Sequence, residues 1–218
     1  IRVLRELQQC HITAGSLTGA LSVARFIAAN SPTPAHQTIE AQLTGRLREL
    51  DPAWYPALGA ACPIERRPST VLHLLKESLP YYERGYTLRT RAALRAQQRA
   101  GLDPVVVTSL GFPRLDGHDE FPDVDTIDDI PHHRLDLGPD FPYRAIPFDQ
   151  SLEWNARLAA PIVEATRPAV LHANSGFRGF DTAVVAIALG RRYGIPVVYD
   201  VRSFLEATWT ADLARSET

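Results

Sequence analysis

The sequence predicts an α/β protein, a single doubly wound parallel sheet preceded by a small helical segment. Two observations carry this prediction. In the last two thirds of the chain, short apolar segments alternate with longer helical ones, which is typical of β-α-β units that cover both faces of a parallel sheet. In the first third, the apolar residues show helical spacing alone. A chain of 218 residues has room for one large domain or for a domain with an appendage.

The helical leader is expected to span residues 1–66 and to form a hairpin of two helices. The second of these helices begins at Pro34, with Thr33 as its N-cap, and ends before Asp51. A proline at the first helical position costs no hydrogen bond, because that backbone N–H would be unpaired in any case.

A polar, proline-flanked segment, residues 62–68, is the expected boundary with an α/β domain at residues 67–218. The expected strands of that domain are residues 71–75, 105–108, a short region beginning at 134, 169–172 and 195–201. The expected helices are residues 87–100, 149–165 and 181–193. The acidic segment between the expected strand at 105–108 and the strand region at 134, residues 111–131, is expected to be a loop.

The composition excludes several other classes of protein. Hydrophobic residues make up 45% of the chain and charged residues 22%, and the formal net charge is −2. The chain is therefore neither basic enough for a nucleic-acid-binding surface nor polar enough to be disordered. Cys10 and Cys62 lack the spacing of a disulfide framework or a zinc site, and they indicate a reducing, cytoplasmic compartment.

The beginning of the chain is unusual. Methionine is absent, even at position 1, and Ile1 opens a segment with no signal-peptide pattern. We therefore expect the sequence to be a fragment of a longer protein.

Candidate binding residues follow the first expected strand. Ligands of doubly wound sheets bind beyond the carboxyl ends of the strands, where loops lead into helices. Gly85 stands just before such a helix, where free amides and the helix dipole favour an anion. Arg89 lies in the first turn of the same helix, where it can bind a ligand or remain a solvated surface charge.

Two later strand ends carry further polar side chains. His172 ends one strand and is followed by Asn174 and Ser175. A histidine in this position can offer a hydrogen bond to a substrate hydroxyl, or it can be a packed residue. Arg202 and Glu206 follow the last strand and can either pair with each other or line the cleft.

The acidic loop does not predict a metal site. Its seven carboxylates, from Asp116 to Asp129, lack the order of ligands of an EF-hand loop. His132 and His133 are adjacent, so on a strand they point to opposite faces and cannot chelate one ion.

Several short segments share an order and a position at strand ends. They are Ser78-Leu79-Pro80, Gly85-Tyr86-Thr87-Leu88-Arg89-Thr90, Thr108-Ser109-Leu110-Gly111-Phe112-Pro113, Ile130-Pro131-His132-His133-Arg134-Leu135, Leu171-His172-Ala173-Asn174-Ser175 and Gly194-Ile195-Pro196-Val197-Val198-Tyr199-Asp200-Val201-Arg202. Together, over residues 69–210, they resemble the amino-terminal domain of group 1 (family 4) retaining glycosyltransferases with the GT-B fold.

The resemblance implies a Rossmann-like sheet that forms the acceptor-side half of a two-domain enzyme, with the carboxyl-terminal donor domain absent. It implies hexosyltransferase-type transfer from a nucleotide-sugar donor to an acceptor hydroxyl, with retained configuration and with no metal or other cofactor. The partners implied are the donor, an acceptor glycan or small molecule, and the missing domain; the isolated half is expected to be inactive. Family members can associate with membranes, although this sequence shows no anchor.

The resemblance also assigns roles to residues. His172 and Asn174 become the catalytic candidates, and Asn174 stands where the family segment has its second histidine. The expected substrate-binding residues are Gly85, Tyr86, Arg89, Ser175, Arg202 and Glu206. Ser203 and Leu205 replace a glycine and a tryptophan that are common in the family, so the acceptor contacts are expected to differ.

A non-catalytic α/β binding or interaction module is the alternative. Such a module has no need to gather polar groups at one edge of its sheet. The placement of Gly85, Arg89, His172 and Asn174 therefore bears on the choice between the two interpretations.

Overall fold

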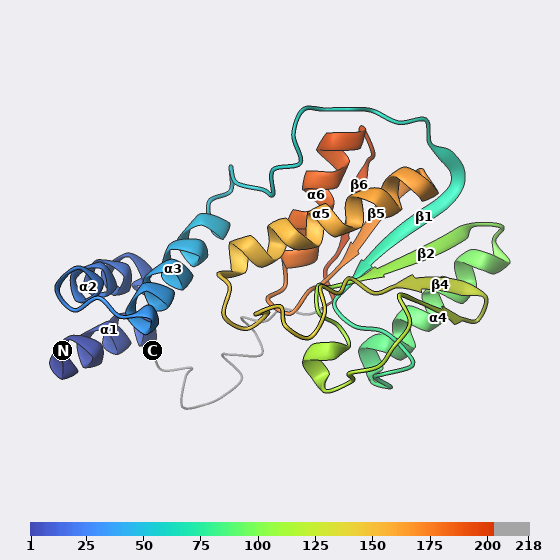
Figure 1. Cartoon of the computed structure of the whole chain (residues 1–218). Helices are drawn as coiled ribbons and strands as arrows, with labels where there is room; N and C mark the ends of the chain where they lie inside the picture. The colour runs from blue at the N-terminus through green and yellow to red at the C-terminus, as the bar shows by residue number, and fades with distance from the viewer. Residues whose placement is uncertain (203–218) are drawn as a thin grey trace. The chain divides into compact units, whose positions relative to one another are not determined.

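The computed structural model describes residues 1–202 (Figure 1). Among these residues the helices are α1 (Arg2–Thr13), α2 (Leu17–Asn30), α3 (Pro34–Glu49), α4 (Gly85–Arg99), α5 (Phe148–Thr166) and α6 (Asp181–Tyr193), with a 3₁₀ turn, η1 (Arg114–Asp116). The strands are β1 (Arg67–Leu75), β2 (Asp103–Thr108), β3 (Val124–Ile127), β4 (Ile130–His133), β5 (Pro168–Asn174) and β6 (Val197–Asp200).

The chain divides into two compact units. One joins Ile1–Tyr55 to Pro142–Glu153, and the other joins Pro56–Phe141 to the residues from Trp154 onward. The expected division lay at residue 66, whereas residues 56–66 group with the sheet. The reason is local: the backbone N–H of Cys62 donates to the carbonyl of Arg192, which lies in α6.

The helical unit contains one helix more than the expected hairpin. Thr33 caps α3 as predicted, since its hydroxyl accepts a hydrogen bond from the backbone N–H of His36 at 3.2 Å. The additional helix is α1, which the sequence did not reveal because its apolar residues are divided between a packed side, where Ile12 lies, and the exposed surface. Gln8 is its buried residue, while Val3 and Leu7 are exposed.

The described strands form one six-stranded sheet in the order β3-β4-β2-β1-β5-β6. All its neighbouring strands are parallel except β3, which runs antiparallel to β4. The strand order reverses at β1, because β2 lies on one side of it and β5 on the other. The carboxyl ends of β1 and β5 are adjacent at this point. This reversal point is where doubly wound sheets bind their ligands.

The hairpin of β3 and β4 corrects two expectations, a loop over residues 111–131 and a strand region beginning at 134. Ile127 pairs with Ile130 across a two-residue turn, Asp128 and Asp129, whose φ angles are 53° and 63°. Two positive φ angles define the tight turn that suits an antiparallel hairpin, and aspartate tolerates them better than most residues do. The Asp-Asp sequence concealed this turn among the loop's other acidic residues.

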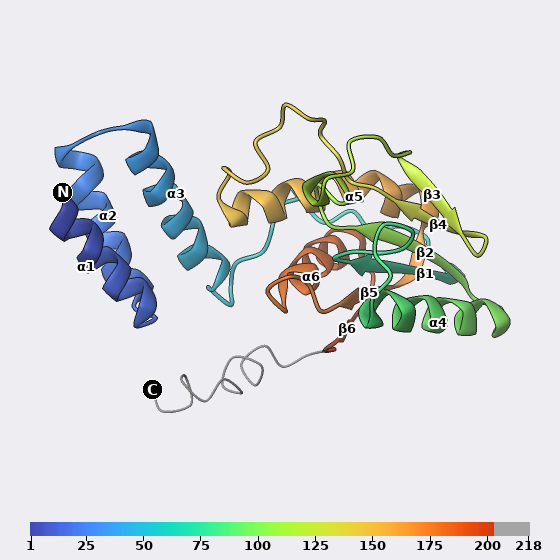
Figure 2. The same ribbon diagram turned by 90° about the horizontal axis from the view of Figure 1, so that it is seen from below.

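Helices cover both faces of the sheet. Figure 2 shows α4 on one side and α5 and α6 on the other. On the α4 side, Leu75, Val106 and Ile130 of three strands pack with Leu94 of the helix. Leu72 and Leu171, which face the other side, are also fully buried. The expected doubly wound architecture is confirmed.

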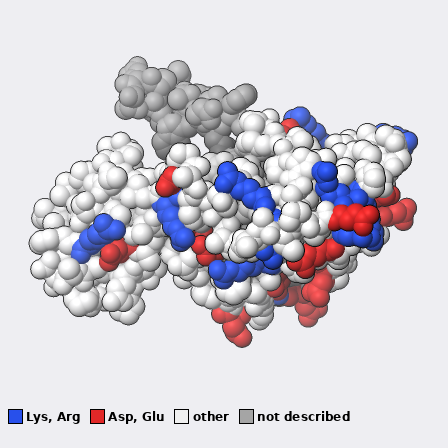
Figure 3. Space-filling view, turned by 90° about the horizontal axis from the view of Figure 1, so that it is seen from above, with Lys and Arg blue, Asp and Glu red and all other residues white. Residues whose placement is uncertain are grey.

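Charged side chains of both signs are interspersed on the face drawn in Figure 3, in keeping with the net charge of −2. Within residues 1–202, no helix combines the length and the apolar character needed to cross a membrane.

Two glycines give a matched test of the fold. A Cβ added at Gly190 would lie 2.7 Å from both the carbonyl oxygen of Ile195 and a side-chain carbon of Val197, whereas one added at Gly85 meets open space. Gly190→Ala is therefore expected to lower the free energy of unfolding by about 1–3 kcal/mol, the usual cost of overpacking. Gly85→Ala is expected to leave it unchanged or slightly raised. Urea denaturation of both variants measures the difference, and equal stabilities would contradict the close packing of α6 on β6.

Candidate functional site

Three neighbouring strands bring most of the described candidate residues to one edge of the sheet. The register pairs Leu74 of β1 with Ala173 of β5, and Asn174 of β5 with Asp200 of β6. The segments that follow these strands begin at Lys76, Ser175 and Val201. Side chains that are far apart in the sequence therefore converge beside the first turn of α4.

Tyr86 connects α4 to this edge. Its hydroxyl donates a hydrogen bond to the carbonyl oxygen of Ser175 at 3.2 Å. Two cations lie near its ring: the Lys76 ammonium is 4.7 Å from the ring centroid, and the Arg202 guanidinium carbon is 5.1 Å from it. Burial raises the pKa of the Tyr86 phenol, so the phenol stays protonated and remains a hydrogen-bond donor.

Arg202 is bound within the protein rather than open to the cleft. Its side chain is 6% exposed, and Nε donates to the Asp200 carboxylate at 2.7 Å. A second nitrogen donates to the hydroxyl of Thr90, and the backbone N–H donates to the Ser175 hydroxyl at 2.8 Å. Burial alone would raise the pKa of Asp200, but the hydrogen bond and charge of Arg202 hold that pKa below its usual value. Arg202 thus ties β6, β5 and α4 together.

His172 and His73 form a pair of rings across β5 and β1. The two residues are register partners, and their ring centroids are 4.8 Å apart. His73 is buried, and its Nε2 lies 2.8 Å from Oε1 of Gln97 in α4. Burial lowers the pKa of half-buried His172, and it lowers the pKa of His73 to about 4. Both imidazoles are therefore neutral at pH 7.

Asn174 lies beneath the surface of the edge. The residue is fully buried, and its backbone carbonyl accepts a hydrogen bond from the Thr182 hydroxyl. Its side-chain amide is close enough to the Tyr86 hydroxyl and the His172 ring to influence the pKa of each. Asn174 is thus enclosed at the edge, and neither polar atom of its side chain has a hydrogen-bond partner among residues 1–202.

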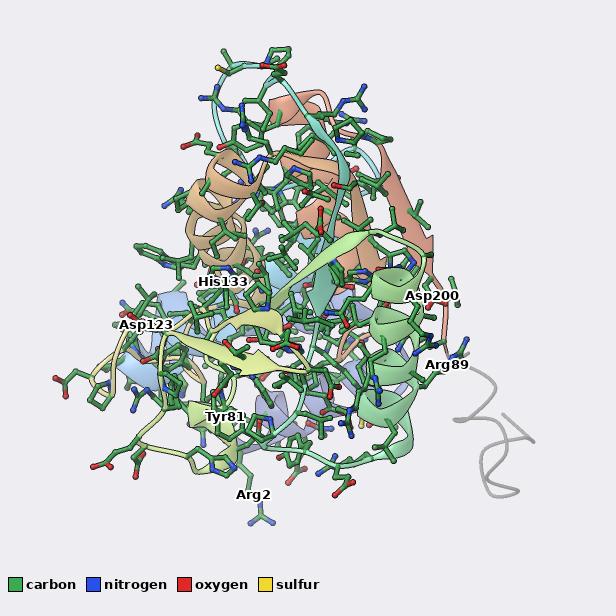
Figure 4. All side chains as sticks on the ribbon, turned by 90° about the vertical axis from the view of Figure 1, so that its right-hand side faces the viewer. Arg2, Tyr81, Arg89, Asp123, His133 and Asp200 are labelled. Carbon is green, nitrogen blue, oxygen red and sulfur yellow. The ribbon has the colours of Figure 1, made fainter. Side chains whose placement is uncertain are left out.

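The remaining candidates differ in their exposure. Gly85 is exposed at the first position of α4, with open space where a side chain would stand. Arg89 is exposed one turn further on, and its charge helps to lower the pKa of Asp200. Figure 4 shows Arg89 on α4 near Asp200. Glu206 lies outside the described residues.

Two residues of the edge were missed by the sequence analysis. Lys76 immediately follows β1, with its ammonium near the rings of Tyr86 and Phe177 and 4.0 Å from the Glu77 carboxylate. Phe177 follows β5 and is 52% exposed. Their positions directly after strands that meet at the reversal of strand order are the signal that could have identified them.

A second cluster fixes the loop that follows β1. The Arg134 side chain is fully buried and donates to the Ser78 hydroxyl at 2.6 Å, to the Leu79 carbonyl at 2.8 Å and to the Asp125 carboxylate at 2.8 Å. The ring of His132 also lies 3.0 Å from the Ser78 hydroxyl, nitrogen to oxygen. Two segments of the sequence pattern, 78–80 and 130–135, are thus in contact.

No group of three His, Cys, Asp or Glu side chains in residues 1–202 is arranged to hold a metal ion. The described chain thus contains a doubly wound α/β unit, with a polar, partly cationic edge at its strand-order reversal, and a separate helical unit.

Comparison with known proteins gives the family. A family model described as glycosyl transferase 4-like domain matches residues 84–217. Because the match spans more than half of the chain, the chain belongs to this family, and the expected family is confirmed.

The other comparisons are more distant. Among the solved structures that match is "Sucrose-phosphate synthase (tll1590) from Thermosynechococcus elongatus", with 15% sequence identity and a TM-score of 0.48. The match covers 66% of this chain and 37% of that one. A search of curated proteins found no match.

Proposed function

We propose that this chain is the acceptor-side half of a retaining glycosyltransferase, which moves a hexose from a nucleotide-sugar donor to an acceptor hydroxyl. The observation that carries the proposal is the edge between β1 and β5 in a member of the glycosyl transferase 4-like family. There, the ammonium of Lys76 lies 4.7 Å from the ring centroid of Tyr86, and the Tyr86 hydroxyl is hydrogen-bonded to Ser175, at the end of the strand that carries half-buried His172.

The charges of the edge suit the departure of a nucleoside diphosphate. As the bond from the sugar to the diphosphate breaks, negative charge grows on the leaving oxygen, and fixed cations nearby lower the energy of that state. Lys76 is 25% exposed, and Arg89 is exposed on α4, three residues after Tyr86. Neutral His172 can hydrogen-bond a sugar hydroxyl. Ser175 and Arg202 hold Tyr86 and the ends of β5 and β6 in place.

The other half of the reaction belongs to a partner domain. We place donor recognition in a carboxyl-terminal domain beyond these residues, and we expect the 218-residue chain alone to transfer no sugar. The reaction proceeds without a metal ion in this proposal. In this proposal, membrane association of the whole protein depends on segments other than this chain.

Transfer by the complete gene product tests the proposal. The product is incubated with uridine, guanosine and adenosine diphosphate sugars and with simple glycosides as acceptors, and release of the nucleoside diphosphate is measured. NMR of the new glycosidic bond gives its configuration, which is expected to match that of the donor. The 218-residue chain serves as the control and is expected to be inactive. No transfer from any donor, with a reading frame that ends near residue 218, would instead support the non-catalytic module.

A further inference from the structure

An exposed aromatic ring stands on a hydrogen-bonded turn at the rim of the site. Phe177 is 52% exposed, and it lies between two glycines whose backbones pair with each other, Gly176 N–H to the Gly179 carbonyl at 2.9 Å. The hydroxyl of Tyr199 also donates to the Gly179 carbonyl, at 2.8 Å. An exposed phenylalanine gains little from burial in the fold, so the restraint on its turn needs another reason.

A buried carboxylate maintains this turn. Asp181, at the start of α6, is 4% exposed and accepts hydrogen bonds from the backbone N–H groups of Phe177 at 3.0 Å and Arg178 at 3.3 Å. A Cβ at Gly176 would overlap the Asp181 carboxylate, so glycine is required there. Burial raises the pKa of Asp181, and the hydrogen bonds from the backbone N–H groups of Phe177 and Arg178 oppose that shift by favouring the carboxylate.

The ring of Phe177 also has a cation beside it. The Lys76 ammonium lies 5.7 Å from the Phe177 centroid and 4.7 Å from the Tyr86 centroid. The ammonium carries three hydrogen-bond donors. The rim thus combines an apolar surface with donors for hydroxyl groups.

We propose that Phe177 and Lys76 form a subsite for a sugar ring of the acceptor, with the ring's carbon–hydrogen face stacked on Phe177 and a hydroxyl bound to Lys76. The subsite rests on the proposed function, because it supplies the acceptor for the transfer. A pyranose suits it, since a pyranose has an apolar face bordered by hydroxyl groups that both donate and accept hydrogen bonds. A turn that is fixed before binding also reduces the entropy lost on binding.

Binding of simple glycosides to the 218-residue chain tests the subsite. Methyl β-D-glucopyranoside and methyl α-D-mannopyranoside are titrated into the ¹⁵N-labelled chain, and the amide shifts of residues 176–179 are followed. Sorbitol provides hydroxyl groups without a ring face, and uridine provides a base that could stack. We expect a pyranoside to shift these amides, and sorbitol and uridine to leave them unchanged.

Three variants connect the binding to the ring. Phe177→Ala is expected to weaken pyranoside binding about tenfold, whereas Phe177→Tyr retains it. Phe26→Ala removes another exposed phenylalanine, in α2, and is expected to bind as the parent chain does. Absence of pyranoside binding, equal binding of sorbitol, displacement by uridine or an unchanged affinity in Phe177→Ala would each overturn the subsite. Because these titrations need no turnover, their outcome is separate from that of the transfer assay.

Discussion

Replacing Arg134 with methionine is expected to lower the free energy of unfolding by about 3 kcal/mol or more, as is usual when one partner of a buried ion pair is removed. The Asp125 carboxylate, 14% exposed, would lose the guanidinium that neutralises it. The Ser78 hydroxyl and the Leu79 carbonyl would each lose the hydrogen bond that the guanidinium donates in the same change. The guanidinium also lies 5.2 Å from the ring centroid of Tyr81 and 5.4 Å from that of Phe112, so the packing of both rings changes.

The chain contains a suitable control for this variant. Arg91 donates two hydrogen bonds to Asp128, at 2.6 and 2.8 Å, but the pair lies on the surface. Ion pairs in water contribute little to stability, so Arg91→Met is expected to unfold almost as the parent chain does. Denaturation of both variants in urea gives the comparison. A similar small loss in both would show that burial of Arg134 does not stabilise the loop after β1.

Acid is expected to unfold the sheet unit at milder pH than its carboxylates alone would require. Burial lowers the pKa of His73 to about 4 and, together with the charge of Arg134, the pKa of His132 to about 3. Both rings gain a proton near pH 6.5 once the chain unfolds, so stability is complete above that pH and falls below it. Each histidine contributes a slope of about 1.4 kcal/mol per pH unit, and the two together cost about 4 kcal/mol at pH 5.

Unfolding free energies measured from pH 7.5 to pH 4.5 test this expectation. The paired variant His73→Leu, Gln97→Leu removes one histidine together with its hydrogen-bond partner. Its slope below pH 6.5 is expected to be smaller by about 1.4 kcal/mol per pH unit, because one proton fewer is taken up on unfolding. A slope equal to that of the parent chain would contradict the account of His73 as a buried neutral ring.

Local patterns were sufficient to predict most of the fold. The helix at 181–193 was predicted with the bounds it has in the structure, because Gly194, at φ 68°, ends it in the conformation that glycine adopts most easily. The hairpin of β3 and β4 was missed because β4 joins the sheet by pairing with β2, which is distant from it in the sequence. The helix α1 was missed because apolar residues on its surface concealed its pattern.

The site was predictable in its location but less so in its details. Strand ends identified His172, Ser175 and Arg202, and the register does bring them to one edge. Burial depends on neighbouring strands, so the sequence alone could not show that Asn174 is enclosed or that Arg202 is bound to Asp200 and Thr90. Those contacts distinguish residues that hold the edge together from residues that face the solvent.

Turnover of His172→Ala in the complete gene product tests the central claim most directly, namely that this edge is the acceptor-side wall of a glycosyltransferase site. His133→Ala, a half-buried histidine of β4, is the control. With folding confirmed by circular dichroism, His172→Ala is expected to lower kcat/KM about 100-fold or more, and His133→Ala is expected to leave it nearly unchanged. Full turnover in folded His172→Ala would contradict the claim.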